Sequence, residues 1–181
     1  IVGGRNNPDI KKGINRVNST MPVGSSIKPI GVYSPAIDKG LSPASIIPNI
    51  PVPIDGWNTP TGYPSTSADT FGPMTVRNGL TYSINIVAAR TLISHVGLES
   101  SKEYLISMGV NPKHINVDPA GLALGTSGIT PVEMAVAFGC IANSGEYISP
   151  ISFTKILDKD DNIICPKGAR GLAINFLCVF Q

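Results

Sequence analysis

Ser25 and Lys28 lie three residues apart, in a segment whose apolar residues predict a helix. Residues at this spacing share one face of a helix, so the hydroxyl and the amine can touch in its first turn. A lysine whose pKa is lowered by desolvation can remove the serine proton and make the hydroxyl nucleophilic. The dipole and free amides of a helix N-terminus favour the neutral amine and a developing oxyanion. Gly24 leaves room for a substrate, so the pair predicts nucleophilic catalysis.

The same spacing also has a structural interpretation, in which Ser25 caps a helix and Lys28 is solvated. About one such serine–lysine spacing is expected by chance in a chain of this composition. Ser152 and Lys155 repeat it, but within a predicted strand, where residues three apart face opposite sides. We therefore keep only the first pair as a candidate.

Ser83 and Asn85 form the only S-x-N triplet of the chain. They fall at a break between two predicted helices, where a hydroxyl and an amide can both project into a cleft. The alternative is a helix cap in which Asn85 bonds its own backbone. His95 and His114 have no nucleophile at a recognisable spacing, so both are expected to be structural or surface residues.

The composition excludes several classes of function. Charged residues make up 14% of the 181 residues, the formal net charge is +2 and aromatic residues are 6%, which argues against nucleic-acid binding. No stretch has the roughly 18 apolar residues that cross a membrane, and no leader or anchor is evident. The three cysteines lack zinc-ligand spacing, so we expect no metal and no cofactor, with Cys140 buried on a helix.

Apolar periodicity and capping residues predict helices through the middle of the chain and strands at its ends. Pro35 should kink the first helix, and Thr130 with Glu133 forms a capping box that opens the last one. A proline-rich segment, residues 41–73, is expected to be irregular. The expected helices are 25–40, 75–82, 86–97, 100–108 and 130–145; the expected strands are 1–4, 148–157 and 162–165, the last two joined by a turn at 158–161.

The strings around these residues resemble the transpeptidases among the penicillin-binding proteins. Three blocks carry the resemblance in the right order, from about Ile1 to Cys165, and the second is closest to class A bifunctional enzymes. The blocks are Asn15-Arg16-Val17 with Pro22-Val23-Gly24-Ser25-Ser26-Ile27-Lys28-Pro29; Phe71 to Arg77 leading into Ser83-Ile84-Asn85; and Leu122 to Gly125, Thr130 to Ala135 and Ala142 to Gly145.

This resemblance implies an α+β (mixed α/β) fold with helices packed on an antiparallel sheet, shared with serine β-lactamases. It implies acyl transfer on peptidoglycan stem peptides ending in D-Ala-D-Ala, and acylation by β-lactams. Ser25 would be the nucleophile and Lys28 its base, while Ser83 would relay a proton and Asn85 would bind Lys28 and the substrate. Gly24 and Ser26 would also contact the substrate. Cell-wall synthesis machinery is a possible partner, and the location would be extracytoplasmic.

The sequence also departs from the family. Its third motif, Lys-Thr-Gly, supplies a substrate-carboxylate grip and is absent here; Lys167-Gly168 does not replace it. We therefore expect a partial transpeptidase domain at residues 1–165 and a divergent apolar tail at 166–181. The glycosyltransferase domain, the membrane anchor and the first strand of the sheet are also missing, so membrane association would come only from the missing N-terminal region.

Two alternatives remain open. A catalytically incompetent fragment, or a domain that binds β-lactam or stem peptide without turnover, would explain the missing third motif. A serine β-lactamase is less favoured, because no Glu-x-x-x-Asn could hold a deacylating water and the second motif has Ile84 in place of Asp.

Overall fold

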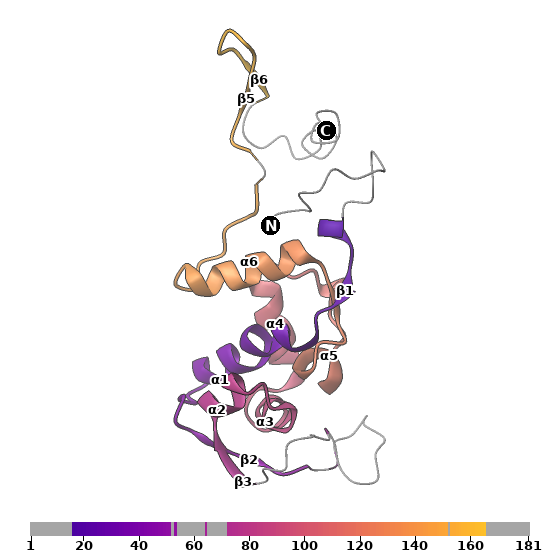
Figure 1. Cartoon of the computed structure of the whole chain (residues 1–181), viewed down its shortest axis with the longest axis vertical. Helices are drawn as coiled ribbons and strands as arrows, with labels where there is room; N and C mark the ends of the chain where they lie inside the picture. The colour runs from indigo at the N-terminus through magenta and orange to yellow at the C-terminus, as the bar shows by residue number, and fades with distance from the viewer. Residues whose placement is uncertain (1–15, 52, 54–63, 65–71, 152, 166–181) are drawn as a thin grey trace.

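The computed structural model describes residues 16–51, 53, 64, 72–151 and 153–165. These residues form helices accompanied by small antiparallel sheets, which confirms the α+β class (Figure 1). The predicted strand at 1–4 and the tail at 166–181 lie outside the described residues, as does Ser152. The α-helices are α1 (Ser34–Asp38), α2 (Val76–Thr81), α3 (Asn85–Thr91), α4 (Leu98–Ser107), α5 (Pro119–Ala123) and α6 (Pro131–Ala142).

Shorter or wider helical turns connect several of them. The 3-10 turns are η1 (Arg16–Asn18), η2 (Gly24–Ser26) and η5 (Pro112–His114), and the π-helical segments are η3 (Lys28–Tyr33) and η4 (Leu92–Val96). The strands are β1 (Met21–Pro22), β2 (Ile46–Asn49), β3 (Gly72–Thr75), β4 (Gly128–Ile129), β5 (Ile156–Leu157) and β6 (Ile163–Cys165).

The helix expected at 25–40 is three segments in succession: the 3-10 turn η2, the π-helix η3 and the α-helix α1. Pro35 explains part of the change, because it has no N–H to donate to the carbonyl of Gly31 four residues earlier. The Ser101 hydroxyl of α4 donates to that carbonyl instead, at 2.6 Å. The Ser34 N–H bonds the Pro29 carbonyl five residues back, as in a π-helix.

The middle helices follow the predictions closely. Thr75 caps α2 by accepting a hydrogen bond from the Asn78 N–H at 3.1 Å. The stripe predicted from Ile86 to Val96 forms α3 and η4 and ends at Gly97. Within it Leu92 is buried, whereas Ile93, which the predicted stripe contains, is exposed.

The capping box of α6 is present as predicted. The Glu133 N–H donates to the Thr130 hydroxyl at 3.2 Å, and the Thr130 N–H donates to the Glu133 carboxylate at 2.8 Å. Cys140 is a free, buried cysteine on this helix, as expected. The helix α5, by contrast, has no counterpart among the predicted elements; Asp118 caps it through the Gly121 N–H at 2.7 Å.

The strands pair in three two-stranded antiparallel sheets, β1 with β4, β2 with β3, and β5 with β6. The prediction of an irregular segment at 41–73 is wrong near its two ends. There Ile46–Asn49 forms a strand that pairs with the strand Gly72–Thr75. Pro48 and Pro73 face each other in this pair, which explains why proline content suggested no strand. The strands predicted around 158–161 are confirmed but shorter, because ladder pairing starts only at Ile156.

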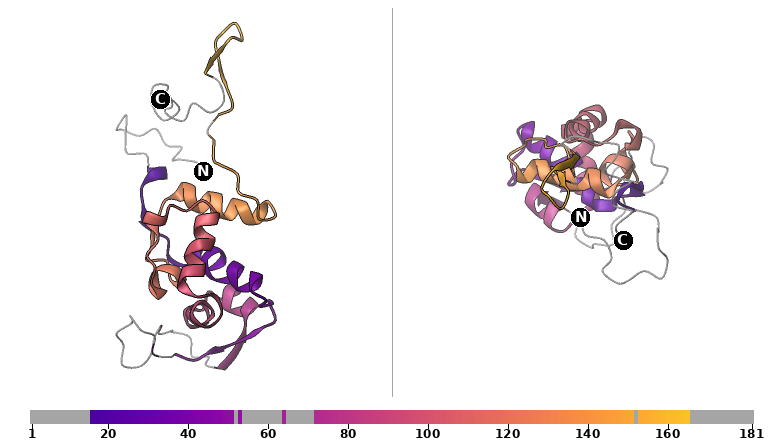
Figure 2. Two further views of the ribbon diagram at one scale, coloured as in Figure 1. Left: turned by 180° about the vertical axis from the view of Figure 1, so that it is seen from behind. Right: turned by 90° about the horizontal axis from the view of Figure 1, so that it is seen from above.

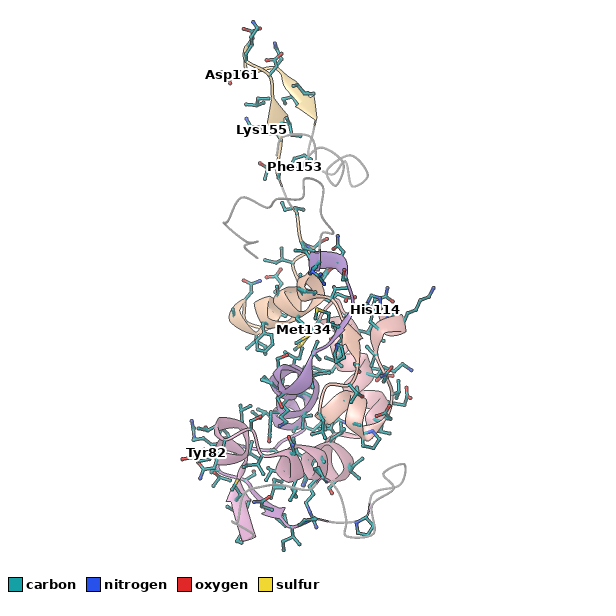
Figure 3. All side chains as sticks on the ribbon, turned by 45° about the vertical axis from the view of Figure 1, so that its right-hand side comes forward. Tyr82, His114, Met134, Phe153, Lys155 and Asp161 are labelled. Carbon is teal, nitrogen blue, oxygen red and sulfur yellow. The ribbon has the colours of Figure 1, made fainter. Side chains whose placement is uncertain are left out.

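The segment η3 lies at the centre of the helical body and contacts α1, α2, α3, α4 and α5. Its residues Ile30, Val32 and Tyr33 are buried in the main apolar core. The β2–β3 pair lies at one end of the body and α6 at the other, with the β5–β6 hairpin beyond α6 (Figures 1 and 2). Lys155 and Asp161 lie on this hairpin, away from the helices (Figure 3). No helix within the described ranges is long and apolar enough to cross a membrane.

Candidate active site

Lys28 is brought together with the Ser83–Asn85 motif, which lies more than fifty residues further along the chain. Its Nζ atom donates to the Ser83 carbonyl at 2.7 Å, to Ser83 Oγ at 3.0 Å and to Asn85 Oδ1 at 2.6 Å. Two of the sequence motifs thus meet at one amine.

Burial distinguishes this lysine from a solvated one. Only 1% of Lys28 is exposed, since it is the first residue of η3 and η3 runs through the core. Desolvation by burial lowers the pKa of Lys28 to about 8, because removing water disfavours the charged ammonium. The interpretation of Lys28 as a surface residue is therefore wrong.

The three oxygens around Nζ differ in what they can do. The Ser83 carbonyl and Asn85 Oδ1 are acceptors only, so each requires an N–H from the amine. A neutral amine has two N–H groups and one lone pair. When the two acceptors take both N–H groups, the lone pair faces Ser83 Oγ, which can donate as well as accept. A proton can therefore pass between Lys28 and the Ser83 hydroxyl.

Ser83 adopts a left-handed backbone conformation, with φ of 53°. Non-glycine residues seldom occupy this region, and those that do concentrate at functional sites. The conformation is fixed on both sides: the Ser83 N–H donates to Leu80 at 3.0 Å, and the Ile84 N–H donates to Gly79 at 2.9 Å. It allows the carbonyl and the hydroxyl of one residue to contact the same amine.

Asn85 is the first residue of α3. Its Oδ1 accepts from Lys28 rather than from its own backbone, so the alternative of a self-capping asparagine is wrong. Asn85 is half-buried, while Ser83 is exposed. The second motif therefore reaches from the buried amine to the surface.

Ser25 lies in the middle of η2 and is exposed. Its side chain caps no helix, which removes the capping interpretation. Within the part of the chain that the structure describes, no hydrogen bond joins its hydroxyl to Lys28. The neighbouring Ser26 hydroxyl donates to the Val23 carbonyl at 2.8 Å and closes the turn locally.

Gly24 precedes Ser25 with φ of +59°, and a side chain there would meet open space. Its N–H donates to the Gly125 carbonyl at 2.9 Å. This contact was not predicted, since nothing in the local pattern of Leu124 to Gly128 relates it to position 24. The one sequence feature that could have indicated a close backbone approach is the glycine that follows Leu124.

The two histidines are structural or surface residues, as predicted. His95 lies in the exposed part of η4. His114 Nδ1 lies 2.9 Å from each oxygen of the Glu133 carboxylate, near α6 (Figure 3). Among the described residues, no three His, Cys, Asp or Glu side chains gather as a metal site would require.

A pocket of about 300 Å³ opens between α1 and α4. Pro35, Asp38 and Tyr104 are among its lining residues. None of the predicted site residues lines it, so it is separate from the cluster around Lys28.

Residues 3–173 match the family described as Penicillin binding protein transpeptidase domain. The chain belongs to this family. The resemblance of the three motif blocks is thereby confirmed.

Individual members of the family show the same relationship. Penicillin-binding protein 1A of Vibrio cholerae is 36% identical over 168 residues, which cover 90% of this chain and 20% of that protein. The crystal structure of penicillin-binding protein 1A from Haemophilus influenzae, 35% identical, superposes with a TM-score of 0.73 over 84% of this chain and 23% of that one.

A second similar structure supports the fold alone. It is the PonA1 protein from Mycobacterium tuberculosis in complex with penicillin V, with a TM-score of 0.72 and 18% identity over 86% of this chain and 43% of that one. The chain spans about a fifth of the length of the curated relatives it matches. The similarity therefore does not show that this chain has the whole activity of those longer proteins.

Proposed function

We propose that this transpeptidase-family chain carries a serine acyl-transfer site that acts on peptidoglycan stem peptides ending in D-Ala-D-Ala. The observation that carries the proposal is the buried Lys28 amine, held by Ser83 and Asn85 and lowered in pKa to about 8. A lysine with this pKa has about a tenth of its amine neutral at pH 7, which is enough for a general base.

Ser25 is assigned the role of nucleophile and Lys28 that of its base. Ser25 Oγ attacks the carbonyl carbon of the D-Ala–D-Ala bond while its proton passes to the neutral Lys28 amine, whose lone pair first turns from Ser83 Oγ to the Ser25 hydroxyl. The exposed position of Ser25, one turn before the buried lysine, supports this division of roles. The hydroxyl must rotate toward Nζ, a change that substrate binding can supply.

Ser83 is assigned the relay of that proton to the leaving amine. The peptide C–N bond then breaks and the terminal D-Ala leaves as a free amine. The stem peptide of the donor peptidoglycan strand remains bound to Ser25 as an ester. An amine of a second peptidoglycan strand attacks this ester, forms the new peptide bond and releases the serine hydroxyl. Asn85 holds Lys28 through Oδ1 and offers its amide N–H groups to the substrate, beside Gly24 and Ser26.

β-Lactams are proposed to acylate the same serine, which is consistent with the name of the family and with the penicillin V complex of the similar structure. Cell-wall synthesis machinery and an extracytoplasmic, membrane-associated location are proposed for a longer parent protein. We propose that residues 1–165 form the partial domain, with 166–181 as a divergent tail of which residues 166–173 still fall within the family match. These assignments rest on the family relationship.

A second candidate function is binding of β-lactam or stem peptide without turnover, or a catalytically incompetent fragment. The exposed position of Ser25 favours it, since no hydrogen bond joins its hydroxyl to Lys28 among the described residues.

Intact-mass measurement after incubation with benzylpenicillin separates these functions. We expect an adduct of one drug mass on the chain and on Ser107→Ala, a distant exposed serine, but none on Ser25→Ala. A stable adduct supports the transpeptidase site, whereas rapid loss of the adduct with released penicilloate would indicate a β-lactamase. No adduct in a sample shown to be folded by circular dichroism would support the second candidate.

A further inference from the structure

Gly125 contacts the backbone of the residue that precedes Ser25. The Gly24 N–H donates to its carbonyl at 2.9 Å, and a Cβ atom added to Gly125 would overlap the backbone of Gly24. The geometry points to Gly125 as a positioning residue for the Ser25 nucleophile. This inference rests on the proposed function and goes beyond its assigned residues.

The steric argument is specific to Gly125. A Cβ atom built on it would overlap the N, C and O atoms of Gly24, all of which are backbone atoms that cannot rotate away. Its φ of +78° adds a preference for glycine. By comparison, a Cβ on Gly128, the first residue of β4, makes only an ordinary contact, 3.6 Å from Thr20 Cβ.

Hydrogen bonds to Asn116 and Gly121 fix the loop that carries Gly125. The buried Ser127 hydroxyl accepts from the Asn116 N–H at 3.0 Å and donates to the Gly121 carbonyl at 3.1 Å. Asn116 Nδ2 also donates to the Thr126 carbonyl at 3.2 Å. A side chain at 125 would therefore displace the exposed turn at Gly24 more readily than its own loop.

Among the described residues, backbone contacts at two places tie the turn of Gly24–Ser26 to the segment that carries Gly125. On its N-terminal side β1 pairs with β4, with Pro22 opposite Gly128. Beyond that ladder, the Gly24 to Gly125 hydrogen bond is the next contact between the two segments. Displacement of Gly24 moves Ser25 relative to Lys28, which is anchored separately in the core, and a shift of about 1 Å at a reacting group can cost about 10² in rate.

The experiment measures benzylpenicillin acylation of the full chain and its Gly125→Ala variant, resolving the maximal acylation rate from the apparent dissociation constant. We expect the maximal rate to fall about 10²-fold in Gly125→Ala. Gly139→Ala on α6 controls for an added methyl group, since a Cβ atom there meets nothing within 4 Å. Gly40→Ala controls for a positive φ, since it has φ of +103° and open space for a side chain. Both controls should stay within a few-fold of the unmodified chain.

Amide hydrogen exchange gives a second readout that does not need acylation. The Gly24 N–H should be protected in the unmodified chain and in both controls, and should exchange faster in Gly125→Ala. An unchanged acylation rate, or an unchanged Gly24 exchange rate, in folded Gly125→Ala overturns the inference. If the unmodified chain forms no adduct, the proposed function fails, and the exchange rate alone then decides whether Gly125 holds the Ser25 turn.

Discussion

The Ser101 hydroxyl lies 2.6 Å from the Gly31 carbonyl and donates a hydrogen bond to it. Ser101 belongs to α4 and Gly31 to η3, the segment that opens with Lys28, so this bond ties the lysine's helix to a neighbouring one. It replaces the bond that Pro35 cannot supply. Both residues are buried, so water cannot take over the role of the hydroxyl.

Ser101→Ala is therefore expected to lower the free energy of unfolding by about 1–3 kcal/mol, because it leaves a buried carbonyl without its donor. Urea unfolding followed by circular dichroism measures this change. Ser107→Ala is the matched control, since its hydroxyl bonds Tyr104 at an exposed site on the same helix. Equal losses in the two variants would contradict the assigned role of the buried bond.

The rate of acylation by benzylpenicillin should depend on pH through Lys28. Its pKa is lowered to about 8, so the neutral, basic form gains about tenfold for each pH unit well below 8 and levels off above it. Stopped-flow acylation between pH 5.5 and 9.5 measures the profile. A rate that does not change over this range would show that the amine of Lys28 is not the base. Lys28→Ala is expected to lose at least about 10² in rate.

Ser83 allows its hydroxyl to be separated from its backbone conformation. Ser83→Gly keeps the carbonyl that contacts Lys28 and adopts φ of 53° without strain. Ser83→Ala removes the same hydroxyl but retains a side chain in the left-handed region. If the hydroxyl relays the proton, both variants should acylate about 10²–10⁴-fold more slowly.

The stability of the two Ser83 variants should differ. Thermal unfolding should place Ser83→Gly at or above the unmodified chain, because glycine removes the cost of the left-handed conformation. Acylation at the normal rate in Ser83→Gly would exclude a relay through this hydroxyl. A loss confined to Ser83→Ala would assign the effect to backbone strain instead.

Glu133 is expected to make the stability of the α6 end depend on pH. Burial alone would raise the pKa of this carboxyl, but hydrogen bonds from Thr130, Asn111 and His114 outweigh burial and lower it. A carboxyl with a lowered pKa in the folded state stabilises that state above its ordinary pKa, and the contribution is lost as the pH falls through the folded value. Glu133→Gln removes the charge and should flatten this dependence.

Urea midpoints between pH 3 and 7 measure the effect. The unmodified chain should lose stability on acidification more steeply than Glu133→Gln. Glu99→Gln is the matched control, because Glu99 pairs with Lys102 on an exposed helix surface. Parallel profiles for the unmodified chain and Glu133→Gln would show that the carboxylate does not contribute through its charge.

The sequence pattern predicted the helix caps and helix ends, which depend on neighbouring residues. The Thr75 cap, the Thr130 and Glu133 capping box and the end of η4 at Gly97 each depend on residues within one or two turns. The contact of Lys28 with Ser83 and Asn85 is not local, and no periodicity contains it. The resemblance of the motif strings to the transpeptidases predicted the contact between Lys28 and Asn85.

Other features could not be predicted because they depend on distant partners. The β2–β3 pair joins two proline-containing strands that have little strand propensity, and it is fixed by pairing rather than by propensity. The close approach of Gly125 to Gly24 depends on a loop a hundred residues away from the nucleophile. The π-helix η3 arises from Pro35 together with Ser101, a residue of another helix.

The π-helix also has an evolutionary consequence. A π-turn is closed by a hydrogen bond from residue i+5 instead of i+4, so it contains one residue more than an α-turn between the bonded groups. A one-residue deletion between Pro29 and Tyr33 can therefore be absorbed by conversion of η3 to an α-turn, with Lys28 and α1 kept on either side. In this segment a gain or loss of one codon changes the type of helix rather than breaking it, so relatives of different length here can retain the same serine–lysine arrangement.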